Sequence, residues 1–252
     1  KRVYLLTTIS FVVGMVELII GGILDLVASD LEVSIGRAGL LITFFALVFA
    51  ISGPVLLFLI GKIERKRATL LALVIFFIGN MVAVFSTTYS MLLISRIISA
   101  ASGALLVVLC LTLASHIVEA TYRGRAIGLV VMGISASIVL GLPIGVILGH
   151  AFGWRSPFVL ITILTIVLIV GVYLFFGQVA SKPPLSLKEQ LVALSNKRVL
   201  FGHMTTFFFL AGHFTLYGYL TPFVKTTMGF DGTWITIVYF VYGIAAVTGG
   251  GI

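Results

Sequence analysis

The sequence predicts an all-α polytopic membrane protein, and three observations lead to that fold class. Of the 252 residues, 60% are hydrophobic and only 10% are charged, whereas a soluble domain needs a charged exterior of roughly a quarter of its residues. The mean hydropathy is +1.26. Apolar runs of about twenty residues, the length of helix that crosses a bilayer, recur along the whole chain.

These runs predict eight helices, with short loops between most of them. The expected boundaries are near 4–28, 37–60, 68–86, 91–116, 126–149, 155–177, 199–223 and 233–252. The longer segment 178–198 carries Pro183 and Pro184 and the amphipathic stretch LSLKEQLVALSNKR. We expect it to be a cytoplasmic linker between two helical bundles, and an interfacial helix within it is compatible with that role.

The basic residues of the loops predict the orientation of the chain. Twelve of them fall on the side of the N-terminus: Lys1, Arg2, Lys62, Arg65, Lys66, Arg67, Arg123, Arg125, Lys182, Lys188, Lys197 and Arg198. Three fall on the other side: Arg37, Arg155 and Lys225. Because basic loops are retained in the cytoplasm, this bias predicts a cytoplasmic N-terminus.

A shift of 196 residues aligns the first two predicted helices with the seventh and eighth without a gap. Identical residues then meet at seven pairs: Phe11/Phe207, Gly22/Gly218, Leu24/Leu220, Gly36/Gly232, Phe44/Phe240, Ala50/Ala246 and Gly53/Gly249. Repeated bundles are typical of secondary transporters, whose sites lie at the repeat interface. The expected domains are a six-helix bundle at 1–177, the linker at 178–198, and a truncated second bundle at 199–252 that holds its first two helices.

Several classes of function are not favoured. The formal charge of +8 is divided among short loops and forms no single basic face, so nucleic acid is not an expected partner. Cys110 lies in an apolar span, and no Cys/His spacing suggests a metal site, so neither a metal nor a cofactor is expected. An intramembrane enzyme would need a catalytic motif, but HExxH and GxSxG are absent from this sequence. Ser135 and His150 could form a Ser–His pair, but no known motif supports it.

Three ionisable residues inside the predicted spans, Glu17, Asp25 and Arg96, are the strongest functional signal. Such a residue costs roughly 2.5 to 3.5 kcal/mol at the bilayer centre, so it normally serves ion or substrate movement. Burial favours the neutral carboxyl, and Glu17 is expected to take up and release a proton; a neutral packing Glu is the alternative. Asp25 is about 12 Å further along the helix, where a solvated helix-end role competes with proton coupling.

Arg96 cannot lose its proton and needs a carboxylate or backbone carbonyls as partners. We expect an exchangeable ion pair with Glu17 or Asp25, in which protonation of the acid releases the guanidinium and changes substrate affinity or helix packing. A purely structural ion pair is the alternative.

The repeat places His213 at the depth of Glu17, in the opposite half of the chain. His213 either titrates or hydrogen-bonds a polar solute, or it is a packing group. Tyr217, one turn further on, offers an aromatic surface with a hydroxyl group. Glu17, Arg96, His213 and Tyr217 are therefore the candidate substrate-binding residues.

Small residues recur at intervals of four in the fifth predicted helix: Gly133, Ser137, Gly141, Gly145 and Gly149. Such a stripe lets another helix approach closely, and Pro143 is expected to add a kink. We expect this surface to be a packing seam, and a place where the two bundles rock against each other.

Specific stretches resemble a known family. They are VELIIGGILDLVASDLEVS at 16–34, AGLLITFFALVFAISGP at 38–54, RIISAASGA from Arg96, YRGRAIG at 122–128 and GWRSPF at 153–158. Over its whole length the chain resembles drug/proton antiporters of the major facilitator superfamily, and most of all bacterial efflux pumps for purine bases and nucleosides, with arabinose and drug exporters nearby. The glycines of the fifth helix resemble the family's antiporter motif, although Leu142 separates Gly141 from Pro143.

The resemblance implies a major facilitator fold and a monomer in the bacterial plasma membrane that exports a small organic solute in exchange for protons. It also implies a gating role for Arg65 and Arg67, but LIGKIERKR places Gly61 and Glu64 where the family pattern has an acidic residue and a glycine. We expect the family's charge latch to be weakened or rebuilt here. An uncoupled facilitator or importer, and a non-transporting sensor, are the alternative functions.

Overall fold

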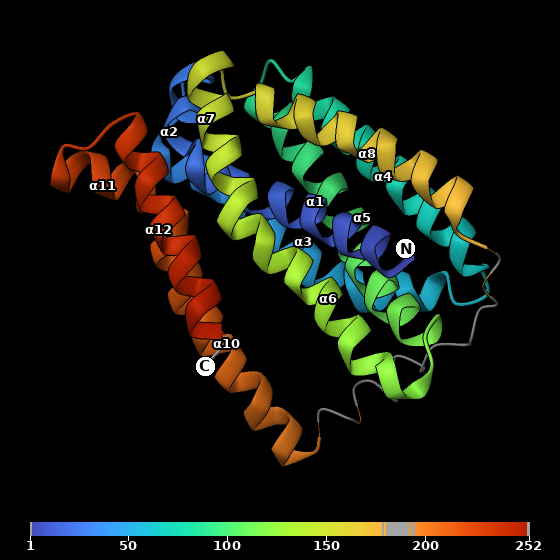
Figure 1. Cartoon of the computed structure of the whole chain (residues 1–252). Helices are drawn as coiled ribbons and strands as arrows, with labels where there is room; N and C mark the ends of the chain where they lie inside the picture. Colours follow the sequence, from blue (N-terminus) through green and yellow to red (C-terminus); the bar gives the residue numbers. More distant parts are fainter. Residues whose placement is uncertain (1, 178, 180–191, 193–194, 251–252) are drawn as a thin grey trace.

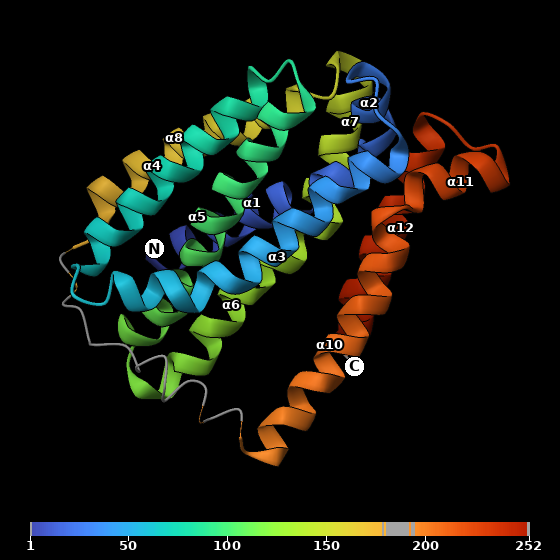
Figure 2. The same ribbon diagram turned by 180° about the vertical axis from the view of Figure 1, so that it is seen from behind.

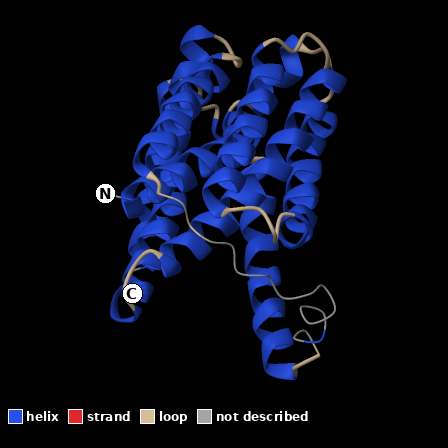
Figure 3. Ribbon diagram, turned by 90° about the vertical axis from the view of Figure 1, so that its right-hand side faces the viewer, coloured by secondary structure: helices blue, strands red, loops and turns tan. Residues whose placement is uncertain are grey.

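The computed structural model describes residues 2–177, 179, 192 and 195–250, and within these residues the secondary structure is helical (Figure 3). The helices of the first half are α1 (Arg2–Gly22), α2 (Leu24–Asp30), α3 (Ile35–Leu59), α4 (Arg65–Val84), α5 (Tyr89–His116), η1 (Ala120–Tyr122), α6 (Arg123–Ala136), η2 (Ser137–Gly141), α7 (Leu142–Phe152) and α8 (Ser156–Phe175). Those of the second half are α10 (Lys197–Gly218), α11 (Leu220–Met228) and α12 (Thr233–Gly250). The all-α prediction is confirmed.

Seven helices among the described residues are long and apolar enough to cross a membrane. One of them, Ala120–Phe152, combines η1, α6, η2 and α7 into a single span, and α12 contributes the shorter apolar stretch Thr233–Tyr242. The helical spans therefore agree with a polytopic membrane protein. The predicted linker at 178–198 lies mostly outside the described residues.

Helix α1 is the centre of the first half, which Figures 1 and 2 show from opposite sides. It packs against α5, α6 and α8, while α4 lies between α5 and α8, and α3 packs on the outside of α5. Apolar side chains of α1 such as Ile9, Val13 and Val16 are fully buried in the resulting core. Most outward-facing positions of α3 and α8 are apolar and exposed, as a lipid-facing surface requires.

Two spans that were predicted as continuous helices are broken, and they break at equivalent positions. The first span turns at Ile23, with φ −120° and ψ 19°, and the seventh turns at Tyr219, with φ −117° and ψ 13°. Ile23 and Tyr219 correspond under the 196-residue shift, so the internal repeat extends to the backbone conformation. A glycine precedes each break, Gly22 in one half and Gly218 in the other.

The small-residue stripe of the fifth span packs against α1 of the same half. A Cβ atom added at Gly133 would meet the carbonyl oxygen of Thr7, and one added at Gly145 would overlap the side chain of Ile19. The packing seam thus faces α1, while η2 and α7, which carry Ser137, Gly141, Gly145 and Gly149, also contact α12 of the second half. The rocking of the two bundles at this surface stays a prediction. The five-residue π-helical segment η2 directly precedes Leu142 and Pro143. Pro143 has no backbone N–H to donate, and the local change from α- to π-helix accommodates the missing hydrogen bond.

The two halves meet at one end of the molecule, which we call the α2/α11 end. There, Leu142 and Val146 of α7 pack with Tyr217, Leu220 and Tyr239 of the second half. Toward its start at Lys197, α10 diverges from α6 (Figures 1 and 2), and residues 197–212 are exposed. Contact between the halves thus covers the α2/α11 end and reaches the middle of the fifth span, where η2 contacts α12.

The close approach of α1 and α6 makes Gly133→Ala destabilising. The added methyl group meets backbone at Thr7, which cannot move aside as a flexible side chain would, so we expect a loss of about 1–3 kcal/mol. The measurement is the temperature at which the purified protein, expressed from its complete coding sequence, loses its monodisperse peak in detergent. Gly128→Ala, on the same helix and with open space around its Cβ, should leave that temperature unchanged; an equal drop in both variants would contradict the packing argument.

Candidate functional site

Arg96 is fully buried (0% exposed) in α5, about two turns from the start of the helix. Its Nη1 donates a 2.6 Å hydrogen bond to the carbonyl oxygen of Val16, and its Nη2 lies 3.4 Å from that of Glu17. The guanidinium carbon lies 4.0 Å from the centre of the Phe45 ring, a cation–π distance. The charge is thus balanced by backbone carbonyls of α1 and by the face of an aromatic ring.

Glu17 is half-buried on α1, directly beside this contact. Among the described residues, its carboxylate takes part in no hydrogen bond and no ion pair, although it lies within electrostatic range of Arg96 and of the Tyr217 hydroxyl. A carboxyl group with no protein partner can bind a proton or hydrogen-bond a polar solute without first breaking a contact. Glu17 and Arg96 are therefore brought together, but no direct ion pair forms between them.

Asp25 does not reach Arg96. The break at Ile23 places Asp25 in the first turn of α2, so the straight-helix geometry expected from the sequence does not apply. Its Oδ2 accepts a hydrogen bond from Lys225 Nζ on α11. The expected exchangeable pair between Asp25 and Arg96 is absent from this structure, and Asp25 instead joins the two halves.

An aromatic cluster from the second half, His213, Tyr217, Tyr239 and Tyr242, faces α1. The His213 ring stacks on Tyr217 with centroids 5.7 Å apart and an interplanar angle of 9°, and its Nδ1 lies 2.9 Å from the Tyr242 hydroxyl. Tyr217 is only 2% exposed, and its hydroxyl donates to the carbonyl oxygen of Leu18 at 3.4 Å. Tyr217 was expected to offer an open ring to a solute, but the half-buried rings of His213 and Tyr242 are the accessible ones.

Three residues of this region were missed by the sequence reasoning: Lys225, Tyr239 and Tyr242. From the sequence, Lys225 is a basic residue of a loop on the side opposite the N-terminus. The 196-residue shift aligns Lys225 with Ser29, four residues beyond Asp25, so it could have indicated that the two side chains lie at similar depth. No sequence pattern singles out the tyrosines of α12, because their importance comes from which helix they face.

At the opposite end of the first half, Glu64 caps α4. Its carboxylate accepts hydrogen bonds from the backbone N–H groups of Lys66 (3.0 Å), Arg67 (3.1 Å) and Val179 (2.9 Å). Burial raises the pKa of the Glu64 carboxyl, but these donors lower it more, so the pKa lies below its ordinary value. The backbone N–H of Arg65, whose side chain is buried, donates to the Val179 carbonyl at 3.1 Å. Glu64 thus holds Val179, at the start of the predicted linker, against the beginning of α4. The Arg67 side chain, in the first turn of α4, is exposed.

Comparison with known proteins adds evidence at the level of the family. Residues 6–252 match the model of the Major Facilitator Superfamily. The MFS-type transporter YbcL of Bacillus subtilis (strain 168) is 36% identical over 248 residues, which cover 98% of this chain and 64% of that protein. A probable sugar efflux transporter of Pasteurella multocida (strain Pm70) is 28% identical, with 98% of this chain and 61% of that protein covered. The chain thus spans less than two thirds of the length of these relatives.

Solved structures show the same fold. A bacterial homologue of the human lysosomal transporter Spinster, in an inward-facing and occupied conformation, matches with a TM-score of 0.77 and 20% identity over 99% of this chain and 59% of that one. The peptide transporter POT in complex with sulfate matches with a TM-score of 0.65 and 15% identity, over 94% of this chain and 49% of the POT chain. The relatives are named as transporters, in agreement with the expectation that the chain is not an enzyme. The chain belongs to the Major Facilitator Superfamily.

Proposed function

We propose that this chain is part of a secondary transporter that exports a small organic solute in exchange for protons. The observation that carries the proposal is the half-buried Glu17 carboxylate, which has no hydrogen-bond partner among the described residues and lies next to the buried guanidinium of Arg96. Intramembrane ionisable groups of this kind are characteristic of proton and substrate pathways. The family membership and the efflux names of several relatives support the same class of function.

In the proposed mechanism, the charge on Glu17 controls the contact between α1 and α5. When Glu17 is ionised, its carboxylate attracts the guanidinium of Arg96 away from the Val16 carbonyl. When Glu17 is protonated, that attraction is lost, and the guanidinium remains on the carbonyl oxygens of α1, as in this structure. Proton binding therefore changes which partner holds Arg96 and shifts the free energy difference between two arrangements of α1 and α5.

Alternating access then requires the two halves to separate at one end and approach at the other. The described hydrogen bonds and ion pairs between the halves lie toward the α2/α11 end. With the predicted cytoplasmic N-terminus, this arrangement corresponds to a transporter closed on the outside and accessible from the cytoplasm. The proposed location is the bacterial plasma membrane, and the proposed functional unit is the monomer.

The proposed solute site lies between Glu17 and Arg96 on one side and His213 and Tyr242 on the other. The stacked rings and hydroxyl groups suit a flat or polyhydroxylated solute, because an aromatic face packs on a ring while a hydroxyl group hydrogen-bonds. The sequence resemblance favours purine bases and nucleosides, while relatives that are 26–28% identical carry the name of sugar efflux transporters. Purines, sugars and drugs are therefore the candidate classes.

Glu17→Gln should abolish uphill transport, because an amide cannot carry a proton. The assay uses everted membrane vesicles that contain the protein expressed from its complete coding sequence, with labelled adenine and arabinose and an imposed proton gradient. We expect the unmodified protein to accumulate one of them and a protonophore to prevent this. Exposed Glu119 provides the matched control, Glu119→Gln, which should transport normally. Uphill transport by Glu17→Gln at the normal rate, or protonophore-insensitive transport by the unmodified protein, would contradict proton coupling.

Arg96→Lys keeps the positive charge but removes the planar fork that reaches two carbonyl oxygens and lies over Phe45. Loss of one charge-assisted hydrogen bond, about 1.5–3 kcal/mol, predicts a roughly tenfold or larger fall in the initial rate of uphill transport. The same vesicle assay measures it, with protein amounts matched by immunoblot. A normal rate would mean that only a positive charge is needed at this position.

His213→Ala should weaken solute binding, because it removes one of the two accessible rings of the proposed solute site. An aromatic contact of about 0.5–1.5 kcal/mol predicts a KM raised by roughly 2- to 12-fold. His203, on the same helix, is exposed and bonds only within its own helix, so His203→Ala is the control. Equal KM values for His213→Ala and the unmodified protein would exclude His213 from the solute site.

A further inference from the structure

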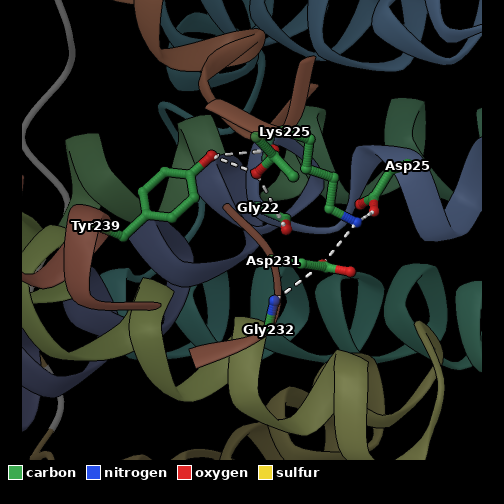
Figure 4. Close-up of polar contacts among 8 residues, drawn as sticks. Gly22, Asp25, Lys225, Asp231, Gly232 and Tyr239 are labelled. Atoms are coloured by element: carbon green, nitrogen blue, oxygen red, sulfur yellow. Dashed lines mark hydrogen bonds and ion pairs between the residues drawn. The ribbon is translucent and has the colours of Figure 1, made fainter. Parts of the chain in front are cut away.

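Lys225 joins the two halves of the chain at the α2/α11 end. It lies on α11 of the second half, and its Nζ donates to Asp25 Oδ2 on α2 of the first half. The same Nζ lies 3.2 Å from Asp231 Oδ1, in the turn between α11 and α12. Figure 4 shows the lysine Nζ joined to both carboxylates, with Tyr239 on the opposite side of Gly22. One cation thus joins a carboxylate of each half.

The two carboxylates that hold Lys225 differ in exposure. The Asp25 side chain is 17% exposed, whereas that of Asp231 is 77% exposed. The Oδ1 atom of Asp25 is buried and finds no hydrogen-bond partner among the described residues. Lys225 therefore provides the neutralising charge for a largely buried acid, and its removal would leave that acid unpaired, which is unfavourable.

The ion pair lies next to a second set of contacts between the halves. Because α1 ends at Gly22, its last carbonyl groups lack partners within the helix. Thr221 Oγ1 lies 3.3 Å from the carbonyl oxygen of Gly21 and 3.4 Å from that of Gly22, and the Tyr239 hydroxyl donates to Gly21 at 3.1 Å. These are contacts between neutral groups. Among the described residues, the pair between Lys225 and Asp25 is the charge-assisted contact between the halves. Such contacts are roughly twice as strong as neutral ones.

We propose that Lys225 determines how firmly the two halves are closed at the α2/α11 end, through an ion pair with Asp25 that forms on closure and separates on opening. The proposal rests on alternating access in the proposed function, and it gives Asp25 a partner other than Arg96. Asp231 allows the ion pair between Lys225 and Asp25 to separate and form again. Asp231 belongs to the same half as Lys225, so the lysine keeps a carboxylate partner while Asp25 moves away and is hydrated.

Pulsed EPR distances between spin labels at Ser29→Cys on α2 and Thr227→Cys on α11 test this directly. Both positions are exposed, and the cysteine within this sequence, Cys110, is buried. In the protein expressed from its complete coding sequence, we expect Lys225→Gln to raise the ratio of long to short distances by about tenfold, within the range of measured coupling between conformational states. An unchanged distance distribution in Lys225→Gln would overturn the proposal.

Arg155→Gln is the matched control. Arg155 pairs with Asp30 at 2.9 Å at the same end of the molecule, but both residues belong to the first half. Its removal should leave the distance distribution unchanged, and a shift as large as that of Lys225→Gln would mean that any loss of charge opens this end. Lys225→Arg keeps the cation and should resemble the unmodified protein, as should the exchanged pair Asp25→Lys with Lys225→Asp. If both of these variants open as widely as Lys225→Gln, the ion pair is not the cause.

The distance measurement requires neither a solute nor a proton gradient. If the unmodified protein fails to export while Lys225→Gln still opens the α2/α11 end, the ion pair stands and the proposed export function fails. If the unmodified protein exports and Lys225→Gln leaves the distances unchanged, export stands and the role of Lys225 is overturned.

Discussion

Water is absent from the hydrocarbon core of a membrane, and this constraint determines where the polar groups of the chain can lie. Helices satisfy the backbone, so departures from helical geometry and buried charges need partners elsewhere in the protein. The guanidinium of Arg96 takes carbonyl oxygens of α1 and the ring of Phe45. The carbonyl groups freed where α1 ends take hydroxyl groups of the second half. Polar contacts thus specify which helices lie against α1. Apolar side chains do this weakly in a membrane, because they pack about equally well against lipid and against another helix.

The first transmembrane segment carries two acids whose surroundings are opposite. Glu17 lies in α1 with no described partner for its carboxylate, while Asp25 lies beyond the break and is bound by Lys225 of the other half. A free carboxyl group suits a step in which protons are exchanged, and a paired one suits a contact that holds two bodies together. Because α1 and α2 are directly joined through Ile23, a displacement of α1 at Glu17 can reach Asp25 within one short segment.

Packing separates the parts of the molecule that are held rigidly from those that can move. The glycines of the fifth span bring its backbone against α1 of the same half, and side chains larger than hydrogen would not fit there. By contrast, the surface between the halves consists of larger side chains, including Leu142 and Val146 against Leu220 and Tyr239. Such an arrangement is consistent with two bodies that move as units.

The sequence by itself determined the helical membrane class, the approximate spans, the family resemblance and the candidate pair Glu17 and Arg96, because hydropathy and intramembrane charge are properties of local composition. Only the tertiary structure decided which groups meet. It placed Arg96 on carbonyl oxygens of α1, covered Tyr217 with His213, turned the glycine stripe toward α1, and joined Asp25 to Lys225. These outcomes depend on the break at Ile23 and on the rotation of each helix about its axis. A break of one residue redirects every side chain beyond it, and residue spacing along an ideal helix does not contain that information.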